Sequence, residues 1–178
     1  GVHRRITHDL WDEKEPTWTP AGDAITFASD RGAPVVLHPV KKPGGFGPYG
    51  IYQVRVADDS LALVIDTAGD DHSPAWSPDG TKLAFISDRG RTPNMYIYDL
   101  EDSTVTRLTD LTGAVTSLSW SRENDRLVYS AYNNYGFDIF AVREPLSVGG
   151  VLTRFQKRTP EAVMTLAQAS LPPPEAIP

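Results

Sequence analysis

Three tryptophans, Trp18, Trp76 and Trp120, each begin a copy of the same sequence pattern. After Trp76 the chain reads Ser-Pro-Asp-Gly, continues through an alternating apolar and polar stretch at 82–87, and then reads Asp-Arg-Gly. Related text follows the other two tryptophans. Alternation of this kind is typical of a half-buried strand. A pattern that recurs along the chain indicates a fold built by stacking one unit on the next, which constrains the architecture more than any local signal.

The spacing of the units identifies the fold class. Trp76 and Trp120 lie 44 residues apart, the period of a four-stranded propeller blade, whereas Trp18 and Trp76 lie 58 apart. An aromatic residue follows each tryptophan by 20 residues in the second and third units but by 34 in the first, which places a 14-residue insertion between the second and third strands of the first unit. These aromatic residues are Tyr52, Tyr96 and Phe140. We therefore predict an all-β chain, a β-propeller fragment of about three four-stranded antiparallel blades.

The turn after each tryptophan carries a second signal. Gly22, Gly80 and Asn124 each stand four residues after a tryptophan. Glycine, and next to it asparagine, accepts the positive φ that closes a tight hairpin, so we predict that backbone at all three positions. The tryptophans themselves are predicted to pack between blades rather than to bind a ligand.

The repeat also divides the chain. Arg5-Ile6-Thr7 matches Arg107-Leu108-Thr109, each arginine lying 13 residues before the next tryptophan, so the segment 2–7 is predicted to be the outer strand of a preceding blade. A partial propeller is predicted over 1–155, with blades at about 15–65, 73–109 and 117–155. The segment 156–178 is predicted to form a short helix and a proline-rich tail.

Three blades are too few for a ring, which typically has four to eight. Open faces and edges invite unwanted pairing. We expect the rest of the propeller to come from a longer chain or from self-association.

Composition excludes several classes of protein. The chain has no cysteine, so disulfides, thiol catalysis and thiolate metal sites are absent. Its formal charge of −6 argues against a nucleic-acid partner. The sequence has neither an apolar run long enough to span a membrane nor an apolar segment at its start like that of a signal peptide.

The second unit carries a family resemblance. Residues 73–85 read Ser-Pro-Ala-Trp-Ser-Pro-Asp-Gly-Thr-Lys-Leu-Ala-Phe and are followed by Ser87-Asp88-Arg89. This resembles the repeat of TolB-type (WD-like) propellers, which also occurs in the propeller domains of prolyl-oligopeptidase-like and tricorn-like peptidases. The resemblance covers about 2–155 and is weakest in the third unit, where Ala131-Tyr132-Asn133-Asn134 replaces Ser-Asp-Arg-Gly. It implies a protein-binding role in the periplasm or cell envelope, because TolB-type propellers bind the peptidoglycan-associated lipoprotein there.

Candidate binding residues come from propeller geometry. Loops between the second and third strands share one face with the linkers between blades, and long loops on a rigid scaffold tend to be functional. Tyrosine, arginine and exposed apolar residues have the composition of protein interfaces. The candidate partner-binding residues are Val36, Leu37, His38, Phe46, His72, Arg89, Arg91, Tyr132, Asn133, Asn134 and Tyr135. For Asp88-Arg89 and Asp30-Arg31, locking of strand ends is the competing interpretation.

Metal and catalytic chemistry find less support. Asp70 and Asp71 lie in a linker between blades and could approach a hard cation such as calcium, although solvated turn acids are the simpler interpretation. No nucleophile elbow, zinc helix or glycine-rich phosphate loop is present. We therefore expect no catalytic residue, no metal and no cofactor. Two hypotheses stand: a non-catalytic protein-binding scaffold, and the accessory propeller that gates substrate for a peptidase domain outside this chain.

Overall fold

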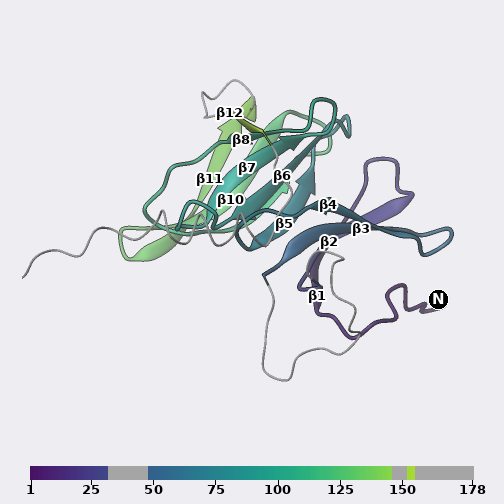
Figure 1. Cartoon of the computed structure of the whole chain (residues 1–178). Helices are drawn as coiled ribbons and strands as arrows, with labels where there is room; N and C mark the ends of the chain where they lie inside the picture. Colours follow the sequence, from purple (N-terminus) through teal and green to yellow (C-terminus); the bar gives the residue numbers. More distant parts are fainter. Residues whose placement is uncertain (32–47, 146–151, 155–178) are drawn as a thin grey trace, which may run out of the picture.

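The computed structural model describes residues 1–31, 48–145 and 152–154. Its strands form three antiparallel sheets that lie side by side in chain order (Figure 1). Blade one contains β1 (Glu13–Trp18), β2 (Ala24–Ser29), β3 (Gly50–Arg55) and β4 (Leu61–Ile65). Blade two contains β5 (Asp71–Trp76), β6 (Lys82–Ser87), β7 (Asn94–Asp99) and β8 (Thr104–Arg107). Blade three contains β9 (Val115–Trp120), β10 (Arg126–Asn133) and β11 (Gly136–Arg143). The predicted all-β propeller fragment is confirmed.

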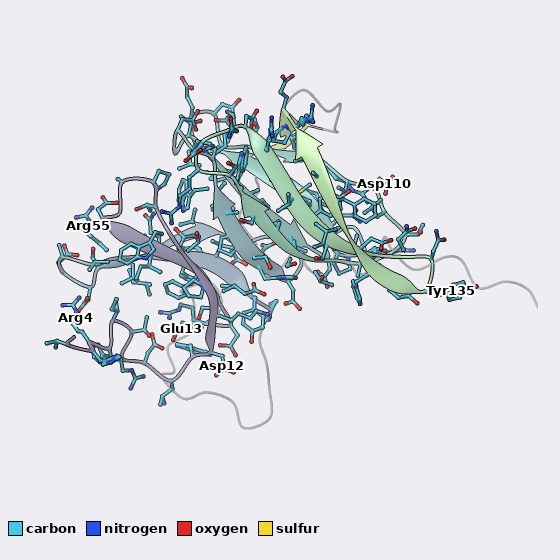
Figure 2. The ribbon with its side chains drawn as sticks, turned by 180° about the vertical axis from the view of Figure 1, so that it is seen from behind. Arg4, Asp12, Glu13, Arg55, Asp110 and Tyr135 are labelled. Atoms are coloured by element: carbon cyan, nitrogen blue, oxygen red, sulfur yellow. The ribbon has the colours of Figure 1, made fainter. Side chains whose placement is uncertain are left out.

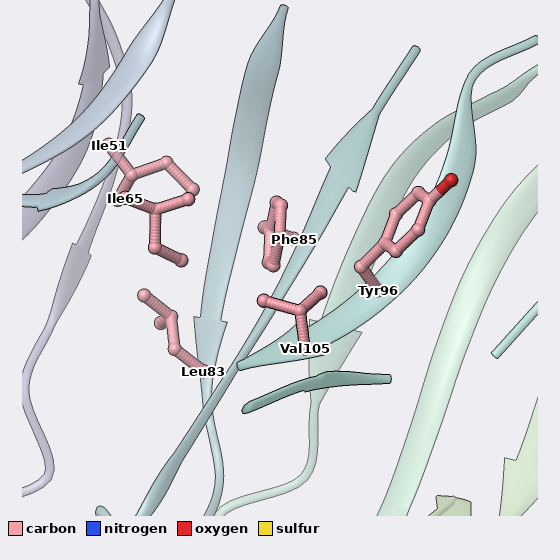
Figure 3. Close-up of a cluster of buried hydrophobic side chains, with 6 residues drawn as sticks. All are labelled: Ile51, Ile65, Leu83, Phe85, Tyr96 and Val105. Atoms are coloured by element: carbon pink, nitrogen blue, oxygen red, sulfur yellow. The ribbon is translucent and has the colours of Figure 1, made fainter. Parts of the chain in front are cut away.

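Successive blades are held together by apolar side chains. Ile51 and Ile65 of blade one pack against Leu83, Phe85 and Tyr96 of blade two in one buried cluster, which Val105 completes (Figure 3). A second cluster joins blades two and three, in which Met95 and Ile97 contact Trp120 and Leu127. Burial of this apolar area is the main force that stacks the sheets.

The tryptophans pack on the blade that precedes them. Trp120 is buried against blade two. Trp76 packs against the cluster shared with blade one, and its Nε1–H donates to Thr26 Oγ1 over 2.9 Å. The inter-blade role predicted for all three holds for these two. It is wrong for Trp18, which is 48% exposed, because the described residues place no blade before blade one.

The turns agree with the sequence in two blades of three. Gly22 and Gly80 have φ of 73° and 74°, and each N–H donates to the carbonyl oxygen three residues earlier. The positive φ predicted for Asn124 is wrong. In that turn the Ser121 hydroxyl accepts from the Asn124 N–H, and the Arg126 N–H closes back onto the Asn124 carbonyl.

Two predicted outer strands differ from the structure. Residues 2–7 form no strand, because no described sheet offers them an edge; Ile6 packs instead against Phe27, Tyr52 and Val54 on the outer face of blade one. The segment expected to complete blade three contributes β12 (Leu152–Arg154), which pairs with β8 and becomes the fifth strand of the second sheet. Blade three therefore has three strands, and β11 is its edge.

Some predictions fall outside the described residues. Most of the insertion after β2 and the predicted helix and tail at 156–178 belong to this group, so the boundary between 1–155 and 156–178 stays a prediction. Within the described part of the chain, no helix is long and apolar enough to cross a membrane.

Candidate functional site

One end of the three sheets carries the linkers between blades and the loops after each second strand. We call this end the loop face and define it by residues 66–70, 88–93, 109–114 and 132–135. Its segments are tied to one another: the Asp70 N–H donates to Asp88 Oδ1 over 2.8 Å, and the Tyr132 N–H donates to the Ala114 carbonyl over 3.1 Å. Asn94 bonds Leu111 through both ends of its side-chain amide. Most of this face is therefore a rigid platform.

A buried carboxylate lies beneath the loop face. Asp71 is 0% exposed and accepts from the N–H and the hydroxyl of Thr67, at 2.8 and 2.7 Å. Burial raises the pKa of Asp71 to about 6, although hydrogen bonds from Ser87 and Thr67 and the charge of Arg89 act in the opposite direction. Desolvation of the charged form is the dominant effect.

The two Ser-Asp-Arg motifs have a structural role in part. Asp30 Oδ1 accepts from the Asp12 N–H at 2.9 Å, as Asp88 does from Asp70, so each aspartate fastens its strand end to the start of the same blade. Arg31 pairs with Asp9 and Glu13 at 2.9 and 2.6 Å.

Arg89 is the counterpart of Arg31 in blade two, but it lacks this pair of carboxylates. Its guanidinium lies 4.2 Å from the ring centroid of Tyr96 and 5.2 Å from that of Phe85. Burial lowers the pKa of Arg89, and Asp71 opposes that shift. Its Nη2 is buried without a hydrogen-bond partner among the described residues. Packing on aromatic rings therefore accounts for much of its position.

An inner-strand contact joins blades one and two. Glu15 Oε2 accepts from the Ser73 N–H at 2.6 Å and lies 3.5 Å from His72 Nδ1. Burial alone would raise the pKa of Glu15, but the hydrogen bonds from His72 and Ser73 outweigh it and the pKa is lowered. His72 is thus held by its neighbours, with 19% of its side chain exposed.

The tip of the β10–β11 hairpin is the most exposed part of the loop face. Asn134 and Tyr135 have φ of 45° and 70° and form the two central residues of a turn that joins the Asn133–Gly136 pair, the pattern of a type I′ hairpin. Such turns favour glycine at the second central position, whereas this one has a tyrosine that is 98% exposed. Figure 2 shows Tyr135 projecting beyond the sheets. A bulky residue held in this backbone and left in solvent is a candidate for function.

The structure brings the candidate residues into two groups. Tyr132, Asn133, Asn134 and Tyr135 share the hairpin tip, where Tyr132 packs edge-on against Phe137. Arg89 and Arg91 lie in the loop of blade two, Arg91 exposed with a φ of 79°. His72 lies on an inner strand and makes the inter-blade contact described above. Four candidates, Val36, Leu37, His38 and Phe46, lie outside the described residues. The binding role of all eleven stays a prediction.

The carboxylates suggested for a cation are engaged in hydrogen bonds. Asp70 Oδ1 accepts from the Tyr49 N–H at 2.9 Å, while Asp71 is buried on Thr67. No group of three acidic or histidine side chains with the arrangement of a metal site forms within the described ranges. A cation beside this pair, and the absence of any other cofactor, stay predictions.

Sequence reasoning missed two features of this face. The Glu15–Ser73 bond could have been found, because both residues stand three positions before a tryptophan and so occupy the same place in successive inner strands. The positive φ of Tyr135 has no signal in the sequence, since aromatic residues rarely adopt it.

A family model described as the TolB beta propeller domain matches residues 40–160. The chain belongs to the TolB beta-propeller family. An uncharacterised protein of Agrobacterium fabrum is 29% identical over 143 residues, covering 74% of this chain and 44% of that protein. The Tol-Pal system protein TolB of Histophilus somni is 41% identical over 69 residues, covering 37% of this chain and 15% of TolB. The chain thus spans less than half the length of either relative.

Solved structures show the same TolB-like fold. A putative TolB from Agrobacterium tumefaciens superposes with a TM-score of 0.61 at 18% identity, covering 83% of this chain and 50% of that one. A prolyl endopeptidase superposes with a TM-score of 0.55 at 15% identity, covering 80% and 22%. At these identities the likeness concerns the fold, which proteins of both kinds share.

Proposed function

We propose that this chain is part of a non-catalytic protein-binding scaffold of the bacterial cell envelope, and that its loop face contacts the partner. The observation that carries the proposal is the hairpin tip, where Tyr135 is 98% exposed on a positive-φ backbone. Exposed tyrosine anchors on a rigid support are typical of protein interfaces, because they bury a large area at a small cost in side-chain entropy. Membership of the TolB family and the likeness to Tol-Pal system proteins support this class of function and the periplasmic location.

The supporting surface suits a partner that docks rigidly. Asn133 Nδ2 donates to Asp138 Oδ2 at 3.2 Å, so the base of the tip is braced on the same hairpin. Asn134 and Arg91 add exposed hydrogen-bonding groups at the same end of the blades. Pre-organised loops of this kind bind with little loss of conformational freedom.

An accessory propeller that gates peptide substrate for a peptidase is the second candidate. The superposition on a prolyl endopeptidase fits it, because the same blades occur there beside a catalytic domain. The two candidates differ in the ligand: a scaffold binds a folded protein, and a gate contacts extended peptide.

Site-specific photo-crosslinking tests the proposal. A photo-reactive phenylalanine analogue placed at Tyr135 is expected to yield a discrete protein adduct in a periplasmic extract. The matched position is Leu100, which is 38% exposed in the turn between β7 and β8 at the opposite end of the blades. Equal adducts at both positions, or adducts with short peptides alone at Tyr135, would contradict a protein-binding loop face.

A further inference from the structure

Blade three presents an uncovered apolar face. Val128, Tyr132, Phe137 and Ile139 point away from blade two and are 41%, 47%, 61% and 80% exposed. The register places Tyr132 opposite Phe137, so their side chains are neighbours on the two paired strands. A patch of this size on a sheet is unusual unless another surface covers it.

The repeat shows what kind of surface fits this patch. Positions 44 residues earlier in blade two point toward blade three and are fully buried by it: Ala84, Met95 and Ile97 correspond to Val128, Ile139 and Ala141. The group that buries them includes Trp120, from the first strand of the following blade. By the same arrangement, the patch on blade three fits a blade that presents a tryptophan from its first strand.

Blade one offers that tryptophan. Trp18 occupies the place of Trp76 and Trp120 but is 48% exposed, and Leu61 beside β3 is 43% exposed. The turn beside it is equally open: Gly80 lies against Pro20 of the preceding blade at 3.4 Å, whereas nothing lies within 4 Å of the same position at Gly22. The outer face of blade one and the outer face of blade three therefore correspond to two successive blades separated from each other.

Blade three also lacks its outer strand, and β11 leaves an edge without a paired strand among the described residues. The segment 2–7 matches the outer strand of blade two in sequence, but it has no sheet to join in this chain. Ile6 already occupies the equivalent of Leu108: both stand 12 residues before a tryptophan and pack at the face where successive blades meet. An added strand at an open edge is a common way to join two chains.

We propose that two copies of this chain associate head to tail, with blade one of each copy on blade three of the other and residues 2–7 added as the fourth strand beside β11. Both contacts are then identical, and the two-fold axis runs through the ring. Six blades result, within the range of closed propellers. The open apolar faces and the unpaired edge are removed in one step.

The mass of the purified chain in solution tests this inference. Light scattering at micromolar concentration is expected to give twice the chain mass of 19.5 kDa. Val128→Asp with Ile139→Asp, or Trp18→Asp alone, is expected to weaken association by at least about 100-fold, as charges buried in an apolar contact do. Leu100→Asp is the matched control, since Leu100 has a similar exposure outside both faces.

Mixing the variants separates this arrangement from any symmetric face-to-face pair. The Trp18→Asp chain keeps a sound blade three, and the Val128→Asp, Ile139→Asp chain keeps a sound blade one, so a mixed dimer has one intact contact. The mixture is expected to dimerise at concentrations where each variant alone is a monomer. Hydrogen exchange in the wild type is expected to show protected amides along β11.

Three results would overturn the inference: a folded wild-type monomer throughout, a dimer unaffected by all these variants, or variants that do not recover on mixing. A heterogeneous aggregate that the Asp variants do not resolve would count against it in the same way. None of these results bears on the loop face, because Tyr135 lies at the hairpin tip beyond the faces that would meet.

Discussion

At the scale of single residues, the repeat places the same residue type in different environments. Trp76 is seated on blade one with its indole N–H bonded to Thr26, whereas Trp18 is half in solvent. The spacing of 58 residues predicts equal positions in the two blades, and it cannot predict that one position is covered and the other is not. Coverage depends on what packs against a blade.

This difference can be measured as stability. Trp76→Ala removes an inter-blade contact and is expected to lower the free energy of unfolding by about 3–5 kcal/mol. Trp18→Ala removes a side chain that is 48% exposed, and is expected to lower it by about 1 kcal/mol or less when measured on the monomer, under dilute conditions. Urea unfolding followed by circular dichroism makes the comparison; equal losses would show that the two environments are alike.

Asp71 gives a pH dependence with a definite sign. Its pKa is raised from 3.8 to about 6 by burial, so its neutral form favours the folded state. Its contribution is fully present below about pH 4 and is lost as the pH rises through 6, an effect of up to about 3 kcal/mol. Asp71→Asn should remove this loss, so wild type minus variant is expected to be larger at pH 4 than at pH 7.5.

Asp79 provides the opposite control. Hydrogen bonds from the Ser77 hydroxyl and from Thr81 hold its pKa below the usual range, so its contribution is present at neutral pH and is lost in acid. Asp79→Asn should therefore change the pH profile in the other direction. Stability curves that run parallel for wild type and Asp71→Asn between pH 4 and 7.5 would contradict the buried-carboxylate account.

At the scale of elements, the sequence predicts strands well and strand partners poorly. Alternation and spacing predict β2 and β6 at their observed bounds, because both depend on neighbours along the chain. The pairing of β12 with β8 instead of β11 depends on which distant edge is open, and no local pattern records that. Asn124 shows the same limit in a turn: the Ser121 side chain closes the hairpin by a different route.

The β10–β11 hairpin carries a prediction of its own. Tyr135 has a φ of 70°, which glycine adopts without strain. Tyr135→Gly is expected to raise the free energy of unfolding by about 1 kcal/mol, because the strain in this turn is relieved. Thermal and urea unfolding would show it. A loss of stability would mean that the tyrosine side chain packs on the hairpin, contrary to its exposure.

At the scale of the whole molecule, the blades form a stiff array whose two ends differ. One end holds short turns closed by Gly22 and Gly80, and the other holds the linkers and loops tied through Asp70, Asp88 and Asn94. The sequence predicts this division from the order of strands. It does not identify the buried Asp71 or the strained Tyr135, since burial and φ follow from packing and pairing in three dimensions.

The affinity of Tyr135→Gly for the protein captured at the loop face tests the central claim most directly. A functional tyrosine held at a cost in stability predicts a variant that is as stable as the wild type, or more so, and that binds at least about 10-fold more weakly, since interface tyrosines commonly contribute more than 1 kcal/mol. Calorimetric titration of both chains with that protein provides the comparison. Unchanged affinity in a stably folded variant would contradict the claim that this face binds the partner through its exposed hairpin.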